Sequence, residues 1–356
     1  MEKQFTGTQI RHQDIRKNGG LFMKYKFLGK TGVQVSELCL GTMSFGSEAD
    51  AGEASRMFRR CREAGVNFFD CSNNYGDGSA ERILGDLIKD CRDEVIITTK
   101  VSQKVGQDVN AMGASRRHIM QAVEQSLTRL KTDRIDVYIV HYFDPCTDME
   151  ETLRALNDLV RQGKVLYLGV SNWAAWQIAK ALGVSVQHGL AQFSCIEPMY
   201  NLVKRQAEVE ILPLALAEQL AVIPYNPLAA GLLSGKYSQT EKPAAGRIIE
   251  KAQYRLRYSD PQYYEIAGLF TEFAHKLGIH PVTLAIRWVM SHPAVTAPII
   301  GARNVEQLEA SLAAADLAMD AALAEGISGL SVRPASATDR LEEELDTKFH
   351  YRNISR

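Results

Sequence analysis

Short apolar runs alternate with amphipathic segments along most of this chain. The apolar runs contain few polar residues, so we expect both of their faces to be covered, as in the strands of a parallel sheet. The segments between them have the apolar periodicity of helices. Strands are predicted at residues 36–41, 66–70, 95–99, 135–140, 165–170, 189–196, 220–224 and 297–300.

Helices are predicted between these strands, and together they indicate an α/β fold of eight strand–helix units. Eight units fit a (β/α)8 TIM barrel, whose usual size is about 250 residues plus insertions. A doubly wound sheet with a second domain is the alternative, but no GxGxxG motif follows the first strand and no change in composition marks a linker. The predicted helices are 54–64, 80–89, 116–130, 149–161, 174–182, 206–219 and 305–315.

The remaining segments flank or interrupt this pattern. We expect residues 1–22 to be a disordered leader or an added segment, 23–330 to be one barrel domain, and 331–356 to be a charged tail with a short helix at 338–345. A hairpin is predicted around Lys30, Thr31 and Gly32. After the seventh strand come a long loop, 236–264, and extra helices at 262–277 and 281–291. The loop carries five tyrosines, so it is either a lid or cofactor clasp, or a cover for the barrel.

Composition excludes several classes of protein. The chain has 46% hydrophobic and 23% charged residues, which is ordinary for a globular protein. A net charge of −1 gives no general attraction to nucleic acid or to an anionic membrane. The most apolar stretch, 211–233, is broken by three prolines and a glutamate, and residues 1–22 lack the apolar region of a signal peptide. The six cysteines have no CxxC or metal-site spacing, so we expect reduced thiols in a cytoplasmic protein without a metal.

The first candidate for chemistry lies at residues 65–85. The strand 66–70 ends on Asp70, and a polar turn then presents Tyr75 before a helix that begins near Ser79. Functional groups collect at such strand ends in parallel α/β folds. Alternatively, Asp70 caps the turn and Tyr75 packs the loop.

The other predicted strands also end on polar side chains. In a barrel, the carboxyl ends of all strands converge on one mouth. These end residues are Asp70, Lys100, His141, Asn172, Glu197, Tyr225 and Arg303.

Three of these side chains, together with Tyr75, suit proton transfer to a carbonyl. A nearby ammonium such as Lys100 lowers the pKa of a phenol such as Tyr75, and Asp70 would keep the lysine charged. A neutral His141 could orient a substrate oxygen, so the set could protonate a carbonyl as hydride reaches its carbon. Each residue also has a structural alternative: His141 as a satisfied rim histidine, and Lys100 with Asp70 as a surface pair. Hydrolase arrangements fit less well.

Specific motifs at these positions resemble the aldo-keto reductase superfamily, in the branch of aryl-alcohol dehydrogenases and potassium-channel β subunits. The resemblance covers about residues 23–330. It is carried by residues 65–70 with 74–76, 99–100, 136–141, 169–173, 224–228 with 231–237, and 298–303 with 307–308.

The resemblance implies a catalytic tetrad and an NADPH site. Tyr75 would be the general acid, Lys100 would lower its pKa, Asp70 would pair with Lys100, and His141 would orient the carbonyl. The cofactor-binding residues would be Gly41, Thr42, Met43, Asp70, Ser171, Asn172, Glu197, Tyr225, Asn226, Pro227, Leu228, Gly231, Leu233, Lys236, Gly301, Arg303 and Gln307. We expect substrate contacts from Met43, Phe45, Tyr75, His141, Tyr142, Phe143 and Trp173, with core packing as the alternative, above all for Phe45.

Two positions depart from the family pattern. Glu197 stands where the family often has a glutamine that contacts the carboxamide, and Ser311 stands where an asparagine often contacts the adenine. Arg303 favours NADPH over NADH, because a guanidinium matches phosphate oxygens. The alternative is that Arg303 only pairs with a neighbouring helix.

We therefore expect an NADPH-dependent oxidoreductase that reduces an aldehyde or ketone, or catalyses the reverse oxidation. Its partners would be small molecules and possible further copies of itself, with no nucleic acid or membrane. A second hypothesis is a nucleotide-sensing regulatory subunit with slow turnover. A third is a barrel isomerase that binds no nicotinamide.

Overall fold

Eight parallel strands form the centre of the molecule in the computed structural model, which describes residues 23–238 and 243–339. Their order is β10-β3-β4-β5-β6-β7-β8-β9. The two ends of this order meet, since the Ile299 amide donates to the Pro224 carbonyl over 2.9 Å and Val222 bridges to Val295. The predicted (β/α)8 barrel is thus confirmed. Its strands are β3 (Cys39–Gly41), β4 (Phe68–Asp70), β5 (Ile96–Val101), β6 (Ile135–Val140), β7 (Val165–Ser171), β8 (Phe193–Glu197), β9 (Ala221–Val222) and β10 (Ile299–Ile300).

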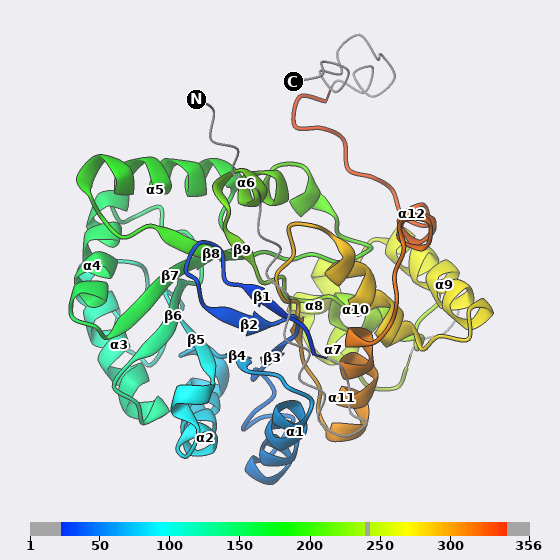
Figure 1. Cartoon of the computed structure of the whole chain (residues 1–356), viewed down its shortest axis with the longest axis horizontal. Coiled ribbons are helices and arrows are strands. Elements are labelled where there is room, and N and C mark those ends of the chain that lie inside the picture. Colours follow the sequence, from blue (N-terminus) through cyan, green and yellow to red (C-terminus); the bar gives the residue numbers. More distant parts are fainter. Residues whose placement is uncertain (1–22, 239–242, 340–356) are drawn as a thin grey trace, which may run out of the picture.

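Helices surround the barrel (Figure 1), and most of them begin at a side-chain cap. Asp50, Ser115 and Asp148 each accept a hydrogen bond from a first-turn amide, which satisfies donors that have no partner within the helix. The helices between barrel strands are α1 (Ala51–Glu63), α2 (Ser79–Ile88), α3 (Arg116–Leu130), α4 (Met149–Arg161), α5 (Ala175–His188) and α6 (Ile211–Glu218), followed near the C-terminus by α11 (Val305–Leu312) and α12 (Ala321–Ser328).

Two predicted helices differ from the structure by five or more residues at one end. The helix expected at 206–219 is a 3₁₀ turn, Gln206–Glu208, followed by α6. Pro213 explains the late start, because a proline costs no hydrogen bond only within the first turn of a helix. Helix α5 continues through Gly183 to His188, six residues beyond its predicted end at residue 182, and strand β8 accordingly begins at Phe193.

An N-terminal hairpin closes the end of the barrel where the strands begin. Strands β1 (Tyr25–Phe27) and β2 (Gln34–Ser36) pair antiparallel, as predicted. The Tyr25 hydroxyl donates to the Gly65 carbonyl, just before β4, over 2.8 Å. Leu28 and Val35 pack into one buried cluster with barrel-interior side chains such as Phe68 and Ile139. This end is therefore filled, which leaves the opposite mouth for ligands.

The insertion between β9 and β10 is helical and lies beside the open mouth. The segment predicted as a loop contains α7 (Arg247–Glu250) and α8 (Ala252–Arg257), and the predicted extra helices are α9 (Pro261–Lys276) and α10 (Pro281–Ser291). Lys251 pairs with Glu48 across the mouth at 3.0 Å. No helix in the described part of the chain is long and apolar enough to cross a membrane. The predicted leader, 1–22, and residues 340–345 of the predicted tail helix lie outside the described residues.

Candidate active site

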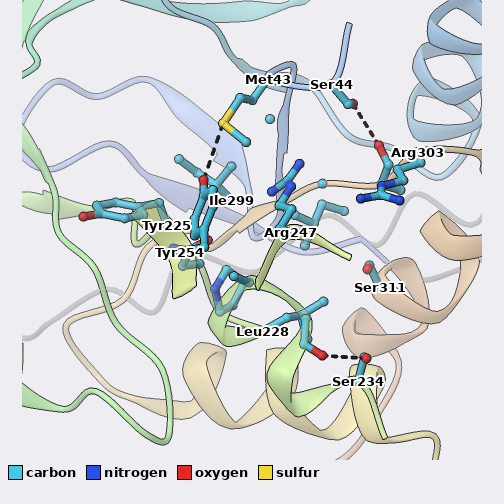
Figure 2. A pocket seen from close by; sticks show the side chains of 18 of the residues that line it. Met43, Ser44, Tyr225, Leu228, Ser234, Arg247, Tyr254, Ile299, Arg303 and Ser311 are labelled. Atoms are coloured by element: carbon cyan, nitrogen blue, oxygen red, sulfur yellow. Dashed lines mark hydrogen bonds between the residues drawn. The ribbon is translucent and has the colours of Figure 1, made fainter. Parts of the chain in front are cut away.

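A cavity of about 670 Å³ opens at the carboxyl ends of the barrel strands. It runs from Asp70, Tyr75 and His141 to Arg303 and Gln307 near the start of α11. Figure 2 shows the tyrosines 225 and 254 on one side of this space and Arg303 with Ser311 on the other. A cavity of this size and elongated lining can hold a ligand as large as a dinucleotide.

Lys100 is completely buried beneath the cavity, between two carboxylates. Its ammonium donates to Asp70 and, over 3.0 Å, to the Cys71 carbonyl, and it lies 3.2 Å from Glu197 Oε2. Asp70 also accepts from the Thr98 hydroxyl. Burial acts to lower the pKa of Lys100, but the two carboxylates prevail and raise that pKa well above its usual value. The lysine is therefore a fixed positive charge under the cavity floor.

Tyr75 stands on a tight turn beside this charge. The turn, Tyr75–Gly78, places Gly76 and Gly78 at φ 54° and 81°, and a Cβ on Gly76 would lie 2.2 Å from Ser79 Oγ. The Lys100 ammonium is 5.5 Å from the centre of the Tyr75 ring. Burial raises the pKa of Tyr75 above its ordinary value, although Lys100 acts to lower it. The expected lowering is thus present but outweighed, and the phenol stays protonated.

His141 completes the group as a neutral imidazole. Its ring packs edge-on to Tyr75 with 6.3 Å between ring centres, and its Nδ1 lies 3.4 Å from Ser72 Oγ. Burial, helped by the Lys100 charge, lowers the pKa of His141 to about 3. A neutral imidazole has one N–H to donate, so His141 can hydrogen-bond to an oxygen in the cavity.

Polar groups from β7 and the segment after β9 form the next part of the wall. Asn172, at φ 57°, donates to the His141 carbonyl over 3.1 Å and accepts from the Tyr225 hydroxyl over 2.6 Å. Ser171 Oγ donates to the Glu197 carbonyl over 2.8 Å. Among the described residues, buried Asn226 Nδ2 has no hydrogen-bond partner, and buried Glu197 Oε2 has only its ion pair with Lys100. A ligand with both a donor and an acceptor would suit them, as a carboxamide does.

The far half of the cavity is bounded by an irregular segment and by cations. The 3₁₀ segment Ala229–Ser234 contains residues with positive φ, including Ala230 at 58° and Gly231 at 96°, and a Cβ on Gly231 would meet nothing within 4 Å. Lys236, Arg247 and Arg303 line this half. Three positive side chains lining one half of a cavity suit phosphate groups.

Arg303 has a partner within the protein. Its Nη2 lies 3.3 Å from Glu250 of α7, and both side chains are partly exposed. The alternative role expected for Arg303, pairing with a neighbouring helix, is therefore present in the structure. Such an exposed pair contributes little stability, and it leaves other guanidinium donors beside the cavity, as Figure 2 shows.

The structure brings most of the predicted site residues to this cavity. Lys100 lies beneath it, while Thr42, Phe45, Phe143, Trp173 and Leu233 do not line it. Phe45 and Leu233 are buried in the core, and Trp173 packs edge-on against Phe143 with 5.0 Å between ring centres. The predicted residues that line the cavity are Gly41, Met43, Asp70, Tyr75, His141, Tyr142, Ser171, Asn172, Glu197, Tyr225, Asn226, Pro227, Leu228, Gly231, Lys236, Gly301, Arg303 and Gln307.

Other lining residues were not predicted as site residues, and five of these are polar or aromatic side chains at the rim or from the insertion. Asn74 donates to Gln103 over 3.0 Å at the open rim. Arg247, Tyr254 and Arg257 come from α7 and α8. Two of them have a sequence signal, since Asn74 directly precedes Tyr75 and Tyr254 belongs to the tyrosine-rich segment 236–264. No sequence pattern marks the others.

These features define a barrel with a deep ligand site and a buried charge cluster at its carboxyl mouth. The chain belongs to the aldo/keto reductase family, because the sequence model described as "Aldo/keto reductase family" matches residues 37–330.

Three relatives illustrate the range of this family. The chain is 37% identical to a probable voltage-gated potassium channel subunit beta of Oryza sativa subsp. japonica, over 83% of this chain and 92% of the relative. It is 34% identical to the uncharacterized oxidoreductase YrpG of Bacillus subtilis (strain 168), over 89% of this chain and 98% of the relative. It is 32% identical to a versiconal hemiacetal acetate reductase of Aspergillus parasiticus, over 82% of this chain and 92% of the relative. The family and these relatives support an oxidoreductase, with carbonyl reduction as its general chemistry and a nicotinamide nucleotide as its cofactor.

Proposed function

We propose that this protein is an NADPH-dependent reductase of aldehydes or ketones in which Tyr75 is the general acid. The observation that carries the proposal is the buried Lys100 ammonium, held by Asp70 and Glu197 and 5.5 Å from the Tyr75 ring. The same groups serve the reverse oxidation of an alcohol.

The cavity residues fit the nucleotide. Glu197 Oε2 and Asn226 Nδ2, with Ser171 and Asn172, would hold the carboxamide, and the Tyr225 ring would lie against the nicotinamide. Lys236, Arg247 and Arg303 would contact the phosphates. Arg303 would bind the 2′-phosphate, because a guanidinium matches phosphate oxygens. When bound, NADPH supplies a hydride to the carbonyl carbon.

The protein's own side chains then manage the proton. Tyr75, protonated because burial raises its pKa, donates its hydroxyl proton to the carbonyl oxygen. The Lys100 charge stabilises the phenolate that remains, and Asp70 with Thr98 fixes the lysine in place. His141, when its proton is on the ring nitrogen that faces the cavity, donates to the same oxygen and orients it. General acid catalysis of this kind contributes roughly 10²–10⁴-fold in rate.

Absorbance of NADPH during reaction with 4-nitrobenzaldehyde tests the proposal, with NADH in parallel. We expect wild type to consume NADPH, and Tyr75→Phe to lose about 10²-fold or more of the rate while binding NADPH as wild type does. Unchanged turnover in Tyr75→Phe would exclude Tyr75 as the acid. Failure of wild type to bind either nucleotide would reject the reductase altogether.

The relatives described as potassium channel β subunits favour a second candidate, a nucleotide-sensing subunit with slow turnover. The same acid–base group is compatible with it. Mixing the NADPH-loaded protein with a carbonyl panel separates the two. Oxidation of bound NADPH within a second indicates a reductase, whereas retention for minutes with every carbonyl indicates a sensor.

A further inference from the structure

Glu197 is a buried carboxyl group that the proton-transfer steps leave unused. It ends strand β8, is 3% exposed and lines the cavity beside Ser171 and Asn172. Within the described part of the chain, its Oε2 has the Lys100 ammonium, 3.2 Å away, as an ion-pair partner and no further hydrogen bond. Lys100 already has Asp70 as its closer partner. Two carboxylates therefore share one ammonium, and the second negative charge is only partly compensated.

The titratable groups near Glu197 come from β8 itself, from strands β3, β4 and β5 elsewhere in the barrel, and from two segments that follow strands. Asp70 on β4 disfavours its ionisation, and Lys100 on β5 favours it. Cys39 on β3, Cys195 on β8, Tyr75 and Tyr225 also lie within electrostatic range. Burial, together with Asp70, raises the pKa of Glu197 to about 8. The cavity wall beside Ser171 and Asn172 thus holds a carboxyl group that gains or loses its charge near neutral pH.

We propose that Glu197 makes the protein distinguish the two oxidation states of its cofactor, because an ionised carboxyl group favours the cationic nicotinamide of NADP⁺ over the neutral ring of NADPH. Binding of NADP⁺ then expels a proton from Glu197, and binding of NADPH does not. By linkage, rising pH strengthens NADP⁺ binding relative to NADPH. This inference rests on the proposed nucleotide site and assigns to it a pH-dependent preference.

Dissociation constants of NADP⁺ and NADPH, measured by titration calorimetry from pH 6 to pH 9, test the idea. The ratio Kd(NADPH)/Kd(NADP⁺) is the informative quantity, since titration of the 2′-phosphate affects both nucleotides alike. In wild type we expect this ratio to rise about tenfold, which corresponds to one unit of pKa difference. In Glu197→Gln it should change less than twofold. Glu306→Gln removes a carboxylate at the far end of the cavity and should leave the wild-type rise intact.

A proton count needs no variant. Calorimetry at pH 7.5 in buffers with different ionisation enthalpies should show that NADP⁺ releases about half a proton more than NADPH does, which is what a pKa difference of about one unit produces midway between the two values. Equal release, or a pH-independent ratio in wild type with both nucleotides bound, would overturn the role of Glu197 and leave the reductase proposal standing. Absence of binding by either nucleotide would instead remove both.

The unliganded protein gives an independent measurement. Because the pKa of Glu197 is raised in the folded state, folding favours its protonated form, and this contribution to stability is lost as pH rises from about 4.5 to 8. The Tm of wild type should therefore fall relative to that of Glu197→Gln over this interval. A Tm difference that does not vary with pH would show that Glu197 does not titrate there and would refute the proposal.

Discussion

The Tyr225 hydroxyl donates a 2.6 Å hydrogen bond to Asn172 Oδ1. The bond joins the residue that follows β7 to the segment that follows β9, and both residues line the cavity. Asn172 in turn holds the His141 carbonyl. Tyr225 is thus connected to the backbone of His141, a member of the proposed proton-transfer group, by two consecutive hydrogen bonds.

Tyr225→Phe removes that hydrogen bond and keeps the ring. We expect the Kd for NADPH to rise about 2–5-fold, because one hydrogen bond is worth about 1 kcal/mol. Tyr225→Ala also removes the aromatic surface and should weaken binding by a further tenfold or so. Quenching of intrinsic fluorescence measures both. Equal affinities for the two variants would show that the ring does not contact the nucleotide.

Lys100→Met leaves Asp70 and Glu197 buried without their cation. Breaking a buried ion pair by removing one partner costs about 3–5 kcal/mol, so the free energy of unfolding at pH 8 should fall by that amount. The loss should be smaller at pH 5.5, where Glu197 is protonated. Urea unfolding at both pH values measures it. Lys131→Met, which breaks an exposed pair with Asp86, is the matched control and should cost less than 1 kcal/mol.

His141 should make the protein acid-sensitive. Its folded-state pKa is about 3, whereas an unfolded chain binds the proton near pH 6.5. Stability is therefore complete above pH 6.5 and falls as pH drops, by about 2 kcal/mol at pH 5 from this residue. His141→Gln should unfold with a weaker pH dependence than wild type in chemical denaturation between pH 5 and 7. The exposed His275→Gln is the control, and an identical slope in all three proteins would contradict the expectation.

Arg303→Met tests the preference for NADPH. Losing hydrogen bonds between a guanidinium and a phosphate should raise the Kd for NADPH about 10–100-fold and leave NADH within about threefold. Glu250→Gln separates the two possible roles of Arg303, because it breaks the pair with α7 and keeps the guanidinium. If Glu250→Gln reproduces the loss, Arg303 acts by positioning α7 and not by contacting phosphate.

Gly85 in α2 tests the packing that supports this side of the barrel. A Cβ there would lie 2.7 Å from backbone atoms of Arg129 and Leu130 in α3. Gly85→Ala should therefore lower the free energy of unfolding by about 1–3 kcal/mol. Gly183→Ala, in the interior of α5 with nothing within 4 Å, should instead stabilise by up to about 1 kcal/mol. Thermal unfolding of the two variants makes the comparison.

The barrel was predictable because its signals are local. The buried strands are apolar on both faces and end on polar residues, and α3 and α4 have strong caps, so their predicted bounds match the structure. The strand ends and the turn after β4 brought Asp70, Tyr75, Lys100 and His141 together as candidates, whereas their roles as a tetrad came from the family resemblance. The roles of these residues stay predictions.

Residues placed by long-range contacts were not predictable. Arg247 and Arg257 reach the cavity because α7 and α8 are tied to distant segments, through Lys251 with Glu48 and Glu250 with Arg303. The direction of the pKa shift of Tyr75 is a similar case. It depends on how completely the ring is buried, and strand periodicity carries no information about burial of a side chain in a turn.

Closure of the barrel has a consequence for synthesis of the protein. Strand β3 pairs with β10, so Cys39 can pair with Ile299 only after nearly the whole barrel has been translated. At roughly 5–20 residues per second, the ribosome needs about 4–15 s to make the segment between β9 and β10. During that time the nascent sheet has two unpaired edges, which are sites of aggregation. Chaperone demand should therefore peak late in translation and end abruptly once β10 emerges.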